Sequence, residues 1–138
     1  MNNMHVQKTE VSFDGEHVHL AYDKECDILE IVFDGVEANC AVELTDHILL
    51  RFNLEQEQAA GLSILDFSLL TRSTEMGPPS FSITGLDGLP EEMRRTVLKI
   101  ITTPPVSHFL KVSCFTPSPP QRIPITYVER PAALAALA

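Results

Sequence analysis

Apolar and polar side chains alternate along most of the first 70 residues, with the period of a strand that has one buried face. The alternation runs through residues 17–22, 28–33, 38–44 and 48–54. In each segment apolar side chains at every second position share one face. The pattern therefore predicts a β-sheet with an apolar face that another part of the structure must cover.

Turn-forming residues separate these segments. Asp14-Gly15 stands between two alternating stretches and can supply the positive φ angles of a type I′ turn, so it predicts a hairpin. Asp34-Gly35 marks a further turn. "LSILDFSLL" (62–70) is interpreted as another strand, with a shift of alternation near Leu65-Asp66 of the kind that a bulge causes. We also expect Glu30 or Glu43 to lie across from Arg51.

The second half of the chain predicts one main helix. "LPEEMRRTVLKII" has Pro90 at the start, acids in the first turn and bases later, so we expect a helix at about 90–102. Its apolar stripe predicts a core-facing side made of Leu89, Met93, Val97, Ile100 and Ile101.

A further strand is predicted at about 106–115, in "VSHFLKVSCF". Residues 116–131 are rich in proline, which lacks the N–H group that a ladder needs. We therefore expect this segment to wrap a sheet edge or to form an extended arm, outside the centre of any sheet.

The fold class that these elements predict is α+β. We expect a small, mainly antiparallel sheet, a meander of hairpins, with the main helix packed on it. Residues 1–70 would form the meander. Residues 71–138 would add the helix, the further strand and the Pro-rich C-terminal arm to the same globular unit, since 138 residues are the length of about one domain.

The net charge of −9 is unevenly distributed. Residues 1–60 hold 13 acids against three bases, and the rest of the chain has a net charge of +1. An acidic half repels phosphate backbones, so we expect no nucleic acid as a partner. Solubility alone explains such a surface. The more specific alternative is an acidic face that steers a basic protein partner.

Three widely spaced cysteines, without a C-x-x-C pair, favour reduced thiols in a cytoplasmic protein. No apolar run is long enough for a membrane span, and we expect no membrane partner. The sequence has no phosphate-binding glycine loop and no recognisable nucleophile motif, so it predicts no cofactor.

Two histidines are the candidate metal ligands. His17 and His19 form an H-x-H pair on one face of a predicted strand, a spacing that can place two imidazoles on one ion. A polar outer face is the simpler explanation of the pair, and this interpretation is favoured. A metal site would need a third ligand, for which the sequence offers His5, His47, Glu30 or Asp66.

The acids of "DKECD" are a second candidate. Asp23, Glu25 and Asp27 have the alternating spacing of a calcium loop, but Ile28 occupies the position where such a loop needs glycine. The segment is therefore interpreted as a solvated, charged turn.

Residues 22–70 resemble the domain-of-unknown-function 2283 family. The resemblance is carried by "YDKECDILEIVF", "VELTDHILLRFN" and "GLSILDFS". It implies a small antiparallel sheet that self-associates, and it implies no established activity. Residues 71–138 lie outside it.

The hypothesis that follows is a non-enzymatic interaction or regulatory module, homodimeric through its sheet edges or its Pro-rich arm. The sequence leaves enzymatic activity open. The alternative is a small metal-binding protein or metal-dependent enzyme that uses His17, His19 and nearby carboxylates. A third idea is a regulatory partner of a basic protein, such as the neutralising half of a toxin pair.

Overall fold

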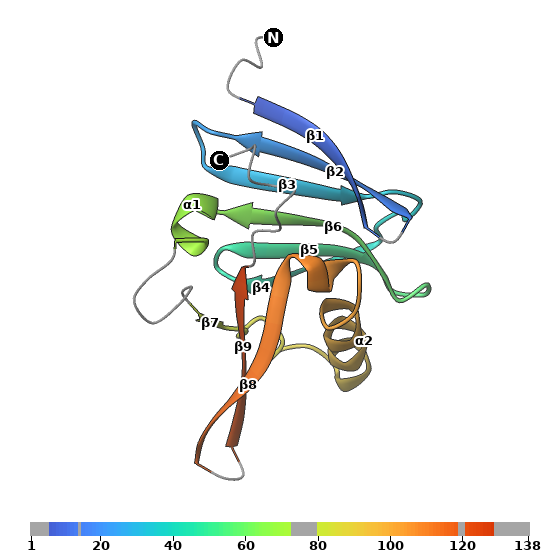
Figure 1. Ribbon diagram of the computed structural model, residues 1–138. Coiled ribbons are helices and arrows are strands. Elements are labelled where there is room, and N and C mark those ends of the chain that lie inside the picture. The colour runs from blue at the N-terminus through green and yellow to red at the C-terminus, as the bar shows by residue number, and fades with distance from the viewer. Residues whose placement is uncertain (1–5, 14, 73–79, 119–120, 129–138) are drawn as a thin grey trace.

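The α+β class is confirmed. A computed structural model of the 138-residue chain describes residues 6–13, 15–72, 80–118 and 121–128. Most strands belong to one large antiparallel sheet, and the main helix and a smaller sheet follow it in the chain (Figure 1). None of the helices in these ranges has the length and hydropathy that a bilayer crossing demands.

Six strands form the large sheet. They are β1 (Val6–Phe13), β2 (Glu16–Asp23), β3 (Ile28–Phe33), β4 (Cys40–Thr45), β5 (Ile48–Asn53) and β6 (Gln58–Leu65). Their order is β1-β2-β3-β6-β5-β4. The sheet is thus two three-stranded meanders joined where β3 pairs with β6, and β1 and β4 become the two edges.

The remaining elements are α1 (Phe67–Leu70), β7 (Phe81–Ser82), α2 (Glu91–Ile101), the 3₁₀ helix η1 (Val106–His108), β8 (Leu110–Ser118) and β9 (Gln121–Val128). The last three strands form a small sheet in the order β7-β9-β8. In Figure 1 the α2 helix and the β8–β9 hairpin lie beside the β4–β5 side of the large sheet.

The expected strand at 62–70 is only half correct. β6 ends at Leu65, and residues 67–70 form the short helix α1. Asp66 has a φ of 54°, which turns the chain out of the strand. The N–H of Phe67 then donates to the carbonyl of Asp27, 3.0 Å away, and the turn buries Phe67 and Leu70. The shift of alternation marks the end of a strand, and the bulge interpretation was wrong.

The expectation for the C-terminal arm was also wrong. Residues 121–128 form β9, the middle strand of the small sheet. Proline is tolerated there because β7 is only two residues long and pairs with Ile125 and Thr126, leaving Pro124 opposite Cys114 of β8 alone. The preceding strand begins at Leu110, because residues 106–108 are helical. Residues 129–131 lie outside the described part.

One hydrophobic core contains side chains from both halves of the chain. The predicted stripe of α2 faces it, with Val97, Ile100 and Ile101 buried. The ring of Phe109 lies 5.6 Å from that of Phe13 and 6.2 Å from that of Phe33, so the segment after α2 packs on the β1–β3 end of the sheet. Each such buried side chain contributes about 1.5–3 kcal/mol to the stability of the fold.

Candidate functional site

The two candidate ligands lie where the alternation predicts. His17 and His19 are exposed on the outer face of β2, while Val18 and Leu20 between and beside them are buried in the core. The strand period alone accounts for this arrangement, because successive side chains point to opposite faces of a sheet. Both imidazoles are therefore open to solvent and to ligands.

Carboxylates from the two neighbouring strands meet these histidines. Glu10 of β1 is the register partner of His19, and its Oε1 lies 3.2 Å from Nδ1 of His17. Asp34 follows β3, and its Oδ1 lies 2.7 Å from Nε2 of His19. We call Glu10, His17, His19 and Asp34 the histidine–carboxylate cluster.

Three members of this cluster are close enough to share one ion. Glu10, His19 and Asp34 each offer a ligand atom, and these atoms lie within 4.8 Å of one another. Imidazole nitrogen with carboxylate oxygen is a donor set suited to zinc and other divalent transition metals. The side chains of His19 and Asp34 are 46% and 54% exposed, so an ion held there would keep open positions toward water.

The described residues that the sequence suggested as a third metal ligand interact with other side chains. His47 lies 3.0 Å from Asp66, and Glu30 accepts hydrogen bonds from Ser63 and Arg51. His5 lies outside the described residues. The position of Glu10 could have been predicted from the sequence, because Asp14-Gly15 predicts a two-residue turn, and such a turn sets the register that places Glu10 opposite His19.

The acids of the β2–β3 turn support the backbone. Asp23 accepts the backbone N–H groups of Glu25 and Cys26 at 3.0 and 3.1 Å. Asp27 accepts the hydroxyl of Tyr22 at 2.5 Å and the hydroxyl of Ser68 at 2.6 Å. These bonds fit the interpretation as a charged turn and tie α1 to the sheet.

The negative charge of this turn perturbs the thiol of Cys26. The residue is exposed, and the negative charge of Asp23 beside it raises the pKa of the thiol, with a smaller contribution from Glu25. A raised pKa leaves less thiolate at neutral pH, so Cys26 is a poor nucleophile here.

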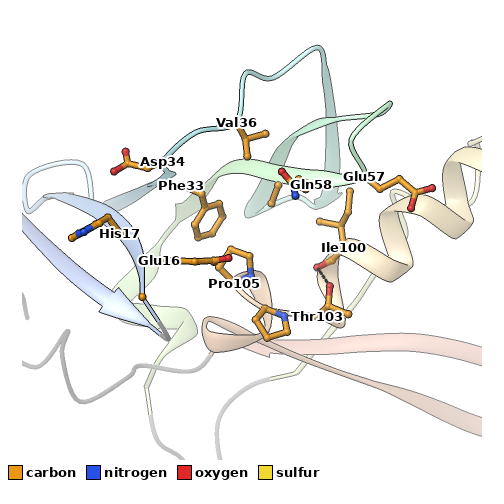
Figure 2. Close-up of a pocket in the computed structure, with 13 residues that line it drawn as sticks. Glu16, His17, Phe33, Asp34, Val36, Glu57, Gln58, Ile100, Thr103 and Pro105 are labelled. Atoms are coloured by element: carbon orange, nitrogen blue, oxygen red, sulfur yellow. Dashed lines mark hydrogen bonds between the residues drawn. The ribbon is translucent and has the colours of Figure 1, made fainter.

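A pocket of about 340 Å³ opens next to the histidine–carboxylate cluster. Its walls come from the start of β2, the end of β3, the β5–β6 turn and the residues that end α2. Figure 2 shows His17 and Asp34 at one rim, with their polar ends directed away from Phe33 and Ile100. A second, shallower hollow of about 470 Å³ lies on the outer face along β1, β2 and β3 and includes Glu10 and His19.

Comparison of the whole sequence with protein-family models, curated proteins and solved structures finds no match. The resemblance of residues 22–70 to the domain-of-unknown-function 2283 family therefore stays a prediction.

Proposed function

We propose that this protein is a non-enzymatic interaction module that self-associates through the free edge of its large sheet. The main support is the difference between the two edge strands of this sheet, β4 and β1. At β4 the N–H of Gly85 donates to the carbonyl of Leu44, 3.1 Å away, so a passing segment covers that edge. Within the described ranges β1 pairs with β2 alone. An eight-residue strand with a free side is a template for another strand.

The sequence of β1 suits antiparallel pairing with a second copy. Phe13 pairs with Glu16 across the two-residue loop, and such a closing pair is hydrogen-bonded. By alternation, the backbone groups of Lys8 and Glu10 point away from β2. A twofold axis through Thr9 then places Lys8 of each copy opposite Glu10 of the other, which is a self-complementary contact.

Light scattering after size-exclusion chromatography tests this proposal. The natural chain is expected to have the mass of a dimer. Lys8→Glu places like charges opposite each other twice per dimer and should raise the dissociation constant about tenfold. The double variant Lys8→Glu/Glu10→Lys exchanges the charges and should restore the dimer. Lys24→Glu, an equal charge change in the exposed β2–β3 turn, is the matched control.

A strict monomer at the highest soluble concentration would refute self-association. A dimer that the single and double variants leave unchanged would refute the β1 edge as its interface, because both variants change the charges that would meet across that edge.

The clustering of ligand atoms favours metal binding as a second candidate function. Glu10, His19 and Asp34 converge within 4.8 Å, with His17 beside Glu10. Calorimetric titration of the metal-free chain with Zn²⁺ should show one site per chain, and His19→Gln should abolish it. His47→Gln removes the imidazole of another, partly exposed histidine–carboxylate pair and should leave binding intact. Equal Zn²⁺ binding by the His19 variant would exclude this site.

A further inference from the structure

Apolar side chains form one wall of the pocket at the end of α2. Phe33, Ile100 and Pro105 line it, and Figure 2 shows these three side chains around one hollow. Phe33 and Ile100 belong to the core and are nearly fully buried, so this wall is held by packing. Its volume of about 340 Å³ is at the lower end of the range for small-molecule pockets, which run from about 300 to 1,000 Å³. It therefore suits one long side chain.

The rim of the same pocket is acidic. Glu16, Asp34 and Glu57 all contribute to it, and its described lining residues include no lysine or arginine. Asp34 and Glu57 have local partners, His19 and Lys99, but their side chains stay 54% and 43% exposed. In Figure 2 the carboxylate of Glu16 reaches toward Pro105. The rim thus carries carboxylates that a bound cation would meet.

The end of helix α2 adds to this negative potential. The helix has 11 residues and ends at Ile101, and the pocket is lined by Ile100, Thr103 and the prolines that follow. The carboxyl end of a helix carries a partial negative charge, which favours a cation nearby. Lys99 in the last turn pairs with Glu57, so the carboxylates of Glu16 and Asp34 and the helix end are the groups that act with the same sign at this pocket.

We infer that this pocket receives an arginine side chain of a partner protein. The methylene stem of arginine suits the apolar wall, and its planar guanidinium donates several hydrogen bonds to carboxylates. Lysine has the charge but presents a compact, strongly hydrated ammonium group. The contact is separate from the β1 edge, because it uses side chains of β2, β3 and α2. It would give the acidic half of the chain a defined basic partner.

Nuclear magnetic resonance titration of the full ¹⁵N-labelled chain tests the inference with three capped tripeptides. These are acetyl-Gly-Arg-Gly-amide, the same peptide with lysine, and the same peptide with citrulline, the neutral isostere of arginine. The arginine peptide should shift the amide resonances of Phe33, Ile100 and Thr103. The lysine peptide should bind more weakly, and the citrulline peptide should produce no saturable shift at equal ionic strength.

The variant Glu16→Gln should lower the affinity for the arginine peptide about three- to fivefold, which is the effect of losing one partly exposed charge pair. Glu43→Gln removes an exposed carboxylate from the opposite edge strand and should leave affinity unchanged. Light scattering of the Glu16 variant should show the oligomeric mass of the natural chain. Oligomeric mass tests the β1 pairing and peptide affinity tests the pocket, so the two proposals can fail independently.

Three results would overturn the assignment. If the citrulline peptide binds as tightly as the arginine peptide, the pocket does not recognise the positive charge. If the lysine peptide binds as tightly as the arginine peptide, the pocket does not recognise the guanidinium group. Shifts confined to residues away from the pocket would place any arginine contact elsewhere.

Discussion

The Nη2 atom of Arg51 lies 3.2 Å from Oε2 of Glu30, although the whole of strand β6 separates their strands. Ser63 of β6 completes the contact, because its hydroxyl accepts from Nη1 of Arg51 at 2.7 Å and donates to Glu30 at 2.6 Å. Gly61 is the register partner of Arg51. Without a Cβ at that position, the guanidinium can lie flat on the outer face and reach across the strand.

Gly61→Ala should therefore destabilise the fold by about 1–3 kcal/mol, the usual effect of forcing an extra methyl group into a packed site. The added Cβ would lie 2.6 Å from the backbone carbonyl of Ile31 and 2.8 Å from Nη2 of Arg51. Urea denaturation measures the change in unfolding free energy. Gly88→Ala is the control, because no atom lies within 4 Å of its Cβ, and it should change stability by less than about 0.5 kcal/mol. Equal effects of the two variants would contradict this account of Gly61.

Glu30→Gln should cost about 0.5–1.5 kcal/mol, because the charged acceptor shared by Arg51 and Ser63 is lost while the side-chain volume is kept. The Glu30 side chain is 45% exposed, which limits the effect through solvent screening. Thermal unfolding at constant pH provides the measurement. Glu43→Gln makes the same chemical change on β4 and should be nearly neutral. The Ser63→Ala background should reduce the effect of Glu30→Gln, since the two residues share one hydrogen bond.

Local patterns predict the strands of the large sheet well because their inner faces are packed against one core. Glu30 pairs with Arg51, but the expectation that it lies directly across from Arg51 was wrong, because strand β6 lies between the two strands. Pairing of β3 with β6 joins residues far apart in the chain, and alternation carries no information about which strands become neighbours. The C-terminal strand was missed for a related reason, since proline is disfavoured only where both sides of a strand are paired.

Part of the candidate site could likewise be predicted from the sequence, and part could not. The outer-face position of His17 and His19 follows from the strand period, and that of Glu10 follows from the hairpin turn. Asp34 reaches His19 through the β2–β3 register, which a longer turn leaves undetermined. The pocket beside them unites four segments between residues 15 and 105, so only the folded chain shows it.

Gly85→Ala should destabilise the protein by at least about 3 kcal/mol. A Cβ at this position would lie 1.5 Å from the carbonyl oxygen of Glu43, so the backbone of the covering segment would have to move away from β4. The displaced segment would also free the β4 edge for intermolecular pairing, and we expect soluble aggregates at high concentration. Urea denaturation and light scattering report the two effects. A Gly85 variant as stable as Gly88→Ala would show that this contact does not hold the edge.

Cys26 should react slowly with iodoacetamide at neutral pH, although it is exposed. Alkylation proceeds through the thiolate, and the negative charge of Asp23 raises the thiol pKa and so lowers the thiolate fraction. Asp23→Asn removes that charge but keeps an Oδ1 acceptor for the N–H groups of Glu25 and Cys26, so the turn should survive. The variant should be alkylated several-fold faster near neutral pH.

The pH dependence separates this electrostatic effect from a change in access. As pH rises through the thiol pKa, both proteins become fully ionised at Cys26, and the two alkylation rates should converge. Mass spectrometry of the Cys26 peptide follows this thiol apart from the other two cysteines, and Asp46→Asn controls for the change in net charge. A rate ratio that stays constant up to alkaline pH would show that Asp23 shields the thiol sterically, and equal rates at all pH values would show that it has no influence.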